Sequence, residues 1–450
     1  MVQAYTKDNV FYLPEESRWG FIQQNAKQED IALKVDTALS TIEKTNKALK
    51  GALPDNYFSR LGLDASKLSA LIDVVNNIDT VGRVYGYFLG KFAATEGKGG
   101  GEFYTPKSVV NLIAEMTEPY QGKIYDPCCG SGGMFVQSIK FIESHNGNTK
   151  DVSIYGQEYT STTYKLAKMN LAIRGIASNL GDVAANTFLK DQHPMLKADF
   201  IMANPPFNQK EWRAPDELVD DPRWAGYTTP PTGNANYAWI LHMISKLSEH
   251  GTAGFVLANG SMSTTTSGEG EIRQQIIEND LVDCMIALPG QLFYTTQIPV
   301  CLWFISRDKA AKSDHSQKRG LRNRSGETLF IDARAIGSMI DRTHKELSAD
   351  DIAAIANTYH AWRGEAEAGG YEAYNDEAGY CKSASLADIK ANDYVLTPGR
   401  YVGAAAIEDD GIPFETKMAE LSQTLYAQMQ ASEQLDAIIR QNLEVLGYGE

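Results

Sequence analysis

Residues 123–133 read Lys-Ile-Tyr-Asp-Pro-Cys-Cys-Gly-Ser-Gly-Gly, and the residues that follow have helical spacing. This pattern predicts an apolar strand, a glycine-rich turn and a helix. Gly130, Gly132 and Gly133 allow the backbone to approach a ligand closely, and the helix start presents free N–H groups. The turn lacks the Gly-x-Gly-x-x-Gly and Gly-Lys-Ser/Thr fingerprints of phosphate-binding loops. With Asp126 at the strand end, it favours a cationic, amino-acid-like ligand such as S-adenosylmethionine.

Acidic residues end the next two predicted strands. Residues 152–158 finish with Glu158, and residues 177–182 finish with Asp182. A nucleoside that lies across the carboxyl ends of a parallel sheet needs polar groups at these points. Glu158 could bind both ribose hydroxyls, and Asp182 could accept a hydrogen bond from an adenine amine. Each acid alone is more often a solvated surface residue, but their order after the glycine turn favours the binding role.

A second motif, Asn204-Pro205-Pro206-Phe207, follows the apolar run 200–203. The lone pair of a planar exocyclic amine is delocalised into its ring, so a methylation catalyst must hold the N–H donors against acceptors. The two prolines leave Asn204 extended, which directs its amide and the Pro205 carbonyl outward. Phe207 offers a flat face for a flipped-out base. The tetrapeptide alone also fits a tight turn, but with the upstream turn it favours methylation of an amine.

Six stretches together resemble the modification subunit of type I restriction-modification systems, an adenine-N6 DNA methyltransferase with the gamma order of motifs. They are residues 101–107, 125–133, 155–158, 203–207, 236–240 and 392–398. The resemblance implies an α/β fold: a Rossmann-like class I methyltransferase sheet with an α-helical N-terminal domain and a C-terminal helical extension. It also implies a site-specific, adenine-specific DNA methyltransferase that uses S-adenosyl-L-methionine.

The resemblance also assigns roles to individual residues. The implied catalytic residues are Asn204, Pro205, Pro206 and Phe207. The implied cofactor-binding residues are Glu102, Phe103, Tyr104, Thr105, Pro106, Lys107, Asp126, Gly130, Ser131, Gly132, Gly133, Glu158 and Asp182. In the family, the stretch from Phe103 to Pro106 covers the methionine end of the cofactor. Thr105 and Pro106 also fit the start of a helix, with threonine as the cap and proline in the first turn, and both interpretations are kept.

The chain has 450 residues, of which 43% are hydrophobic and 22% charged, an ordinary globular composition. It contains no run of about 18 apolar residues and no amino-terminal signal, so we expect no membrane association and a cytoplasmic location. The five cysteines and seven histidines show neither a disulfide framework nor metal-ligand spacing, so we expect no metal.

Periodicity divides the chain into three parts. Residues 1–95 are expected to form a helical N-terminal domain, 102–400 the methyltransferase domain and 401–450 a C-terminal helical region for subunit association. A glycine-rich linker at 95–101 separates the first two, and the helical domain is expected to begin part-way into that of the family. Strands are predicted at 123–126, 152–158, 200–203, 254–258, 284–288 and 300–305, alternating with helices. The last two lie close together, which predicts an antiparallel hairpin at one edge of the sheet.

The net charge of −15 and the pI near 5.0 are unusual for a protein that binds DNA alone. Residues 307–324 are an exception, with seven basic and two acidic residues and a net charge of +5. They are predicted to form a hairpin loop between strands at 300–305 and 328–331, either as a charged mobile loop or as a phosphate contact. The long stretch 208–236 either closes over target DNA, with Lys210 and Arg213 contacting phosphates, or packs as a structural insertion.

Apolar residues near the C-terminus repeat at close to heptad spacing. They are Phe414, Met418, Leu421, Leu425, Leu435, Ile439 and Leu446. The pattern predicts a long amphipathic helix, which either packs on its own domain or, as its length and terminal position favour, on a partner helix. In the resembling family, such helices meet the specificity subunit. The implied partners are double-stranded DNA, one specificity subunit for two modification subunits, and a restriction subunit.

The predicted reaction is direct displacement, in which a flipped adenine stacks on Phe207 and its amine donates to Asn204 and to the Pro205 carbonyl. The cysteines of the turn, Cys128 and Cys129, are rejected as nucleophiles. Two alternatives stay open. The methyl acceptor could be cytosine N4 or a glutamine side-chain amide, since similar motifs serve planar amides. The chain could also be a non-catalytic scaffold that binds the cofactor.

Overall fold

The computed structural model describes residues 11–76, 105–293, 297–314, 319–364, 373–404 and 414–445. The chain divides into two compact units, residues 1–403 and 404–450, which are described separately. The predicted linker at 95–101 and three predicted cofactor-binding residues, Glu102, Phe103 and Tyr104, lie outside the described residues.

The described α-helices are α2 (Trp19–Gln24), α3 (Ile31–Thr45), α4 (Tyr57–Arg60), α5 (Ala65–Asn76), α7 (Lys107–Thr117), α8 (Gly133–Ser144), α9 (Ser161–Ile173), α10 (Asn236–Lys246), α11 (Glu269–Glu278), α12 (Ala349–Arg363), α14 (Leu386–Ala391) and α15 (Phe414–Val445). The strands are β1 (Gly122–Asp126), β2 (Val152–Gly156), β3 (Ser178–Asn179), β4 (Ala198–Ala203), β5 (Leu247–Ala258), β6 (Val282–Ala287), β7 (Val300–Ser306), β8 (Lys312–Asp314), β9 (Arg319–Leu321), β10 (Glu327–Asp332), β11 (Ser338–Met339), β12 (Lys345–Glu346) and β13 (Cys381–Ser385).

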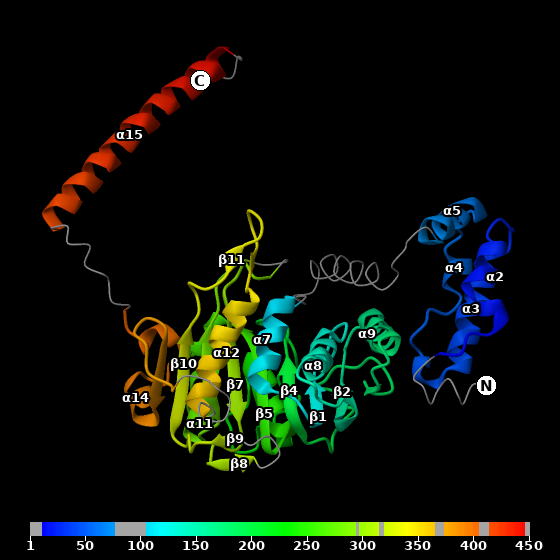
Figure 1. Cartoon of the computed structure of the whole chain (residues 1–450), viewed down its shortest axis with the longest axis horizontal. Helices are drawn as coiled ribbons and strands as arrows, with labels where there is room; N and C mark the ends of the chain where they lie inside the picture. The colour runs from blue at the N-terminus through cyan, green and yellow to red at the C-terminus, as the bar shows by residue number, and fades with distance from the viewer. Residues whose placement is uncertain are drawn as a thin grey trace. The chain divides into compact units, whose positions relative to one another are not determined.

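A nine-stranded sheet in the order β13-β10-β6-β7-β5-β4-β1-β2-β3 forms the centre of the first unit (Figure 1). The pairs β1–β2, β2–β3, β1–β4, β4–β5 and β6–β10 are parallel. Strand β7 runs antiparallel to both β5 and β6, and β13 runs antiparallel to β10. The strand order reverses at β1, between β4 and β2, where a ligand site is expected beyond the carboxyl ends of the strands.

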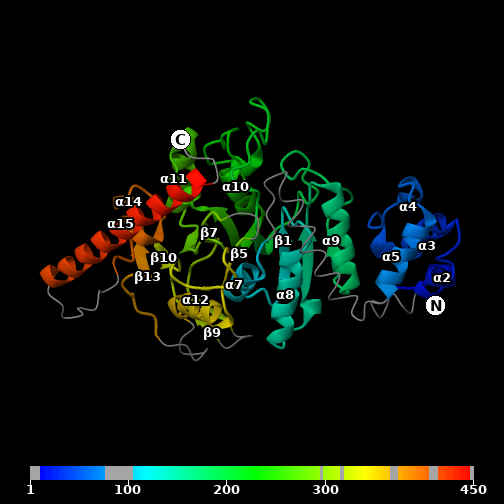
Figure 2. The same ribbon diagram turned by 90° about the horizontal axis from the view of Figure 1, so that it is seen from above.

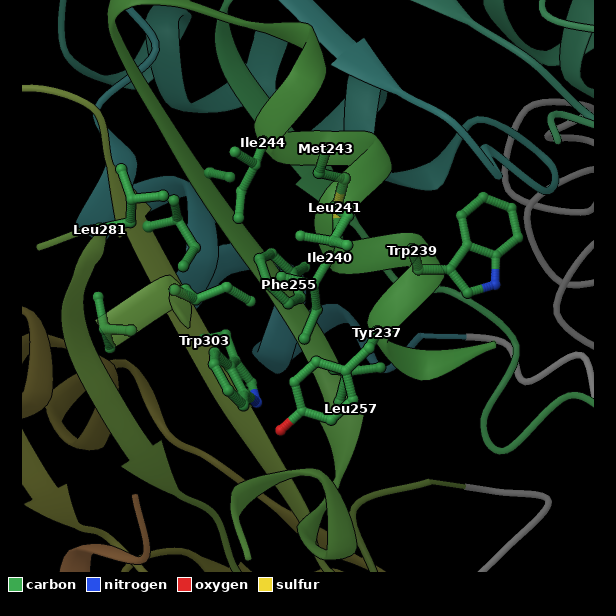
Figure 3. Close-up of a cluster of buried hydrophobic side chains, with 14 of the residues drawn as sticks. Tyr237, Trp239, Ile240, Leu241, Met243, Ile244, Phe255, Leu257, Leu281 and Trp303 are labelled. Atoms are coloured by element: carbon green, nitrogen blue, oxygen red, sulfur yellow. The ribbon is translucent and has the colours of Figure 1, made fainter. Parts of the chain in front are cut away.

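Helices cover both faces of this sheet, as the view in Figure 2 shows. Helices α7, α8 and α12 lie on one face, and α10 and α11 lie on the other. Strands β6 and β7 are buried along their whole length, which explains why they read as continuous apolar runs rather than as alternating ones. On the second face, Tyr237 of α10 points toward Trp303 of β7, and the cluster continues through Phe255 and Leu257 of β5 (Figure 3).

Local sequence signals explain where several helices begin. Helix α8 starts directly after the glycine turn, with Gly132 in the left-handed region at φ 80°. Helix α12 starts with a capping box, in which the Ser348 hydroxyl accepts from the Asp351 N–H and the Asp351 carboxylate accepts from the Ser348 N–H. Helix α7 starts at Lys107 after Pro106, and no side chain caps it, so the predicted cap role of Thr105 is wrong.

The expected α/β fold with helical N- and C-terminal regions is confirmed, but two details of the sheet are wrong. The antiparallel pair β6–β7 exists, yet it lies inside the sheet, because β10 and β13 extend the sheet beyond β6. Residues 307–324 are not a hairpin loop between neighbouring strands, because β6 lies between β7 and β10. The segment instead contains its own short ribbon, β8–β9.

The helices within residues 11–76 pack around a small core of their own, formed by Ile22, Ala26, Ile31, Ala38, Leu68 and Ile72. In the second unit, α15 is a single helix of 32 residues. Its apolar side chains Met418, Leu421, Leu425, Leu435 and Ile439 are all exposed. No helix in the described part of the chain has both the length and the apolar character needed to cross a membrane.

Candidate functional site

Asp126 is the last residue of β1, and its side chain is almost completely buried. Its Oδ1 atom accepts a hydrogen bond of 3.0 Å from the backbone N–H of Cys128, which fixes the carboxyl group at the start of the turn. Burial raises the pKa of Asp126 to about 7. A cation placed beside such a group favours its ionised form. Asp126 is not part of the lining of the cavity described below, so its pairing with an ammonium group stays a prediction.

The turn itself depends on two glycines in the left-handed region, Gly130 at φ 53° and Gly132 at φ 80°. A Cβ atom at Gly132 would lie 3.3 Å from the side chain of Leu171, so this position also requires a small residue for packing. A Cβ atom at Gly130 or Gly133 would meet nothing within 4 Å. These two glycines therefore leave open space beside the turn.

Glu158 lies two residues after β2 and is buried at 5% exposure. Its Oε2 atom accepts a hydrogen bond of 3.0 Å from the Gly130 N–H, and its Oε1 atom accepts one of 2.8 Å from the Thr160 N–H. The carboxylate is thus held against the glycine turn from both sides. Each oxygen can accept a second hydrogen bond, so the group suits a diol such as a ribose edge.

Asn204 follows the last residue of β4, at the same edge of the sheet as Asp126 and Glu158. Its Nδ2 atom donates a hydrogen bond of 2.9 Å to the hydroxyl of Thr105. After it, the ring of Phe207 packs edge-to-face against Phe293, with 5.9 Å between the ring centroids. The motif is therefore tied to the segment before α7 on one side and to an aromatic contact on the other.

A cavity of about 350 Å³ opens between the glycine turn and the motif after β4. Its lining consists of Pro127, Cys128, Gly130, Glu158, Tyr159, Thr160, Asn186, Thr187, Phe188, Asn204, Pro206, Gln209 and Trp239. Four residues predicted for two different roles, Gly130 and Glu158 for the cofactor and Asn204 and Pro206 for catalysis, thus face one space. The size is within the range of small-molecule sites.

The other predicted residues that the structure describes are not part of this lining, and Lys107 lines a different cavity. Ser131, Gly132 and Gly133 belong to the turn and the start of α8, where the Ser131 carbonyl accepts a hydrogen bond of 2.7 Å from Asn170. Asp182 is exposed, and its backbone N–H donates to the side chain of Gln192. Its carboxylate therefore stands outside the cavity.

Nine residues of the lining were not among the predicted site residues, and they include Asn186, Phe188, Gln209 and Trp239. The rings of Phe188 and Trp239 lie 4.3 Å apart between centroids, and in Figure 3 Trp239 points away from Tyr237 and the rest of the buried cluster. Trp239 belongs to the stretch 236–240 that carried part of the family resemblance, which was the available signal. Phe188 and Asn186 had none, because they sit in an irregular segment after β3.

The stretch 208–236 is a packed structural insertion. Trp212 and Trp224 are buried in the main core, and the guanidinium of Arg213 donates to four backbone carbonyls of the same stretch. Arg223 donates from this stretch to the carbonyls of Thr187 and Phe188 in the cavity wall. These internal hydrogen bonds disfavour the phosphate contact considered for Arg213, which stays a prediction. Lys210 is exposed.

Several cations of the basic stretch 307–324 are also used inside the protein. Lys309 is buried and donates to Asp280 at 2.6 Å, and Arg324 is buried and donates to Asp283 at 3.1 Å. Arg322 pairs with Glu327 at 2.8 Å. Lys309 and Arg324 are therefore too buried to contact phosphate, and a phosphate contact by the rest of the stretch stays a prediction.

The thiols of the turn are poorly suited to act as nucleophiles. Burial raises the pKa of Cys128 and of Cys129 well above the ordinary value for a thiol, which disfavours the reactive thiolate. Within the described residues, no cluster of three or more histidine, cysteine, aspartate or glutamate side chains has the arrangement of a metal site.

Comparisons with known proteins show the family of the chain. Residues 76–410 match the N-6 DNA methylase family, and residues 2–78 match the HsdM N-terminal domain family. The chain is 48% identical to the type I restriction enzyme HindI methylase subunit of Haemophilus influenzae, over 99% of this chain and 98% of the relative. It is 40% identical to the MjaIX methylase subunit of Methanocaldococcus jannaschii, over 99% of this chain and 78% of the relative.

A solved structure shows the same fold. The methyltransferase subunit of a type I restriction-modification system from Streptococcus thermophilus superposes with a TM-score of 0.73 at 24% identity. The superposition covers 89% of this chain and 83% of that structure.

Proposed function

The chain belongs to the N-6 DNA methylase family, as the methylase subunit of a type I restriction-modification system, and from this premise we propose how its residues transfer a methyl group from S-adenosylmethionine to N6 of adenine. The observation that carries the proposal is the shared cavity of about 350 Å³, in which Gly130 and Glu158 face Asn204 and Pro206. Cytosine N4 and protein amides are not favoured as acceptors, because the matching family methylates N6.

The cofactor is proposed to bind along the carboxyl ends of β1 and β2. The buried carboxyl group of Asp126 pairs with the ammonium group of the methionine moiety, and the Glu158 carboxylate accepts from the ribose hydroxyls. Gly130 and Gly133 leave room for the ligand beside the turn. S-adenosylmethionine supplies an electrophilic methyl group on a sulfonium. The exposed Asp182 and the segment from Glu102 to Lys107 are proposed to contact the outer side of the same ligand.

The catalytic residues are proposed to be Asn204, Pro205, Pro206 and Phe207. The adenine amine donates one N–H to the Asn204 side-chain oxygen and the other to the Pro205 carbonyl. These acceptors favour a tetrahedral amine whose lone pair is free to attack the methyl group. Phe207 supports the flipped base from the side, and Pro206 shapes the wall between the two ligands. No covalent intermediate with the protein is required.

Recognition of the DNA site is proposed to belong to another subunit. The net charge is −15, and Arg213, Lys309, Arg322 and Arg324 are all engaged internally. A protein with this charge gains little from phosphate contacts. A specificity subunit that supplies basic surface and sequence recognition explains how the chain acts on double-stranded DNA.

Helix α15 is proposed as the contact with that specificity subunit. Its apolar residues recur near heptad spacing and are exposed, with Leu421 at 60% and Leu435 at 60%. Such a stripe fits a helix of a coiled-coil type. The proposed assembly has two of these chains and one specificity subunit, and a restriction subunit joins it for cleavage.

The test is transfer of labelled methyl from S-adenosylmethionine to duplex DNA, followed by nucleoside analysis. The chain is assayed alone and with its candidate specificity subunit. Label in N6-methyladenine that requires both chains is the expected result. Label in another base, or label in the protein fraction, would contradict the proposal.

A further inference from the structure

The hydroxyl of Thr105 contacts the side chain that we place at the centre of the reaction. The Nδ2 atom of Asn204 donates to Thr105 Oγ1 at 2.9 Å, although the two residues are far apart in the sequence. Asn204 lines the cavity, whereas Thr105 is not part of the lining. Thr105 therefore contacts the NH₂ end of the amide without being a wall residue of the ligand space.

The helix that follows does not need this hydroxyl. Helix α7 begins at Lys107, and the N–H groups of Val109 and Val110 donate to the carbonyl of Pro106. Thr105 makes no capping hydrogen bond to α7. The Thr105 hydroxyl instead accepts a hydrogen bond from Asn204, so a role in helix initiation does not account for a hydroxyl at this position.

The chemistry of the amide explains what the hydrogen bond between Asn204 and Thr105 can do. A carboxamide carries an acceptor at one end and donors at the other, and its terminal torsion has a broad minimum. A target amine can only donate to Asn204, so the oxygen must face the amine and the NH₂ group must face away. A hydroxyl that accepts from the NH₂ group fixes the plane of the amide. It also polarises the amide and makes the oxygen a stronger acceptor.

We propose that Thr105 is a positioning residue for Asn204, holding the amide so that its oxygen meets the target amine. The inference rests on the proposed function and deepens it. It assigns the hydroxyl of Thr105 to the methyl-transfer step instead of to cofactor binding. The result of losing the hydroxyl is then a slower transfer at unchanged cofactor affinity.

The test uses the full chain assembled with its specificity subunit. Thr105→Val keeps the shape of the side chain and removes the acceptor, and Thr105→Ser keeps the hydroxyl. Thr117→Val is the matched control, because the Thr117 hydroxyl donates to Ile113 within the same helix α7 and is buried. Single-turnover methyl transfer gives the rate of the step, and equilibrium titration with S-adenosylmethionine gives the cofactor Kd.

We expect Thr105→Val to slow transfer by about tenfold or more, with the cofactor Kd within about twofold of the wild type. Thr105→Ser should restore most of the rate, and Thr117→Val should change neither quantity. A Kd that rises in step with the lost activity would overturn the inference, because it would assign the hydroxyl to the cofactor. An unchanged rate in Thr105→Val would overturn it as well.

The wild-type reaction separates this inference from the proposed function. If the wild type methylates adenine N6 and Thr105→Val does so at the same rate, the positioning role is excluded but the proposed function stands. Wild-type protein that binds the cofactor but methylates no adenine would remove the function, and the inference with it.

Discussion

The backbone N–H of Gly130 donates a hydrogen bond of 3.0 Å to Oε2 of Glu158, which joins the glycine turn after β1 to the end of β2. The same carboxylate accepts from the N–H of Thr160. The wall of the cavity is therefore preorganised by a buried acid, and the two elements proposed to bind the cofactor are held as one unit.

Replacing Glu158 should weaken cofactor binding more than replacing Asp182, which lies outside the cavity. Glu158→Ala removes the acceptor for the ribose and releases the turn, so we expect the Kd for S-adenosylmethionine to rise by about tenfold or more. Asp182→Ala is the comparison, because Asp182 is exposed and outside the cavity. The Kd of both variants can be measured by isothermal titration calorimetry. A larger rise in Kd for Asp182→Ala than for Glu158→Ala would contradict this account.

Cofactor affinity should depend on the ionisation of Asp126. Burial raises the pKa of Asp126 to about 7, so the ammonium partner is bound best above that pH, and affinity should increase between pH 6 and about 7.5. The ammonium group itself begins to deprotonate near pH 8, which limits the window from above. Titrations across this range should show the increase in the wild type and its loss in Asp126→Asn. An equal slope in both proteins would exclude Asp126 as the titrating group.

The same pKa predicts a stability effect of defined sign. Between the ordinary pKa of an aspartate and about 7, folded protein binds a proton that unfolded protein does not. The contribution of Asp126 to the free energy of unfolding therefore falls as the pH rises through this interval. Chemical denaturation of the ligand-free protein at several pH values should show a smaller loss with rising pH in Asp126→Asn.

Arg324 should matter for stability rather than for DNA binding. Its guanidinium is buried against Asp283, which is also buried and accepts from the hydroxyl of Tyr359 at 2.6 Å. Arg324→Ala leaves a buried carboxylate with one partner fewer, so we expect a loss of about 3–5 kcal/mol in the free energy of unfolding. Arg334→Ala is the comparison, because the Arg334 side chain is 58% exposed in its pair with Asp332, so we expect a smaller loss than for Arg324→Ala. Similar unfolding curves for the two variants would refute the structural role.

Helix α15 should be required for assembly and dispensable for cofactor binding. We expect Leu421→Glu with Leu425→Glu to abolish co-elution with the specificity subunit, because both side chains are exposed on one apolar stripe. Gln423→Glu with Gln430→Glu adds the same charge on the opposite side of the helix and should leave assembly intact. The cofactor Kd should be unchanged in both. Retained co-elution in the leucine variant would place the contact elsewhere.

Local signals predicted those parts of the site that depend on neighbouring residues. The strand, turn and helix around Gly130 follow from glycine and from hydrophobic spacing, and Asn204 follows β4 as expected. The position of β7 between β5 and β6 could not be predicted, because it depends on pairing between strands distant in sequence. The contact of Phe188 with Trp239 was missed for the same reason.

Charge in the sequence was a poor guide to surface function. Lys309 and Arg324 lie in the most basic segment of the chain, yet both are buried with acidic partners that are distant in sequence. A run of basic residues does not reveal whether each cation meets solvent or a carboxylate. The net charge of −15 predicts that this chain has little basic surface to offer DNA, and that prediction remains to be tested.

The central claim is that Asn204 acts on the target amine and not on the cofactor. The most direct test is single-turnover methyl transfer to adenine N6 by assembled Asn204→Ala, with the cofactor Kd measured on the same preparation. Asn279→Ala, which removes an exposed asparagine far along the chain, is the control. We expect Asn204→Ala to lose transfer by at least about a hundredfold while its Kd stays within about twofold of the wild type. Transfer close to the wild-type rate, or a Kd that rises with the loss of transfer, would contradict the account.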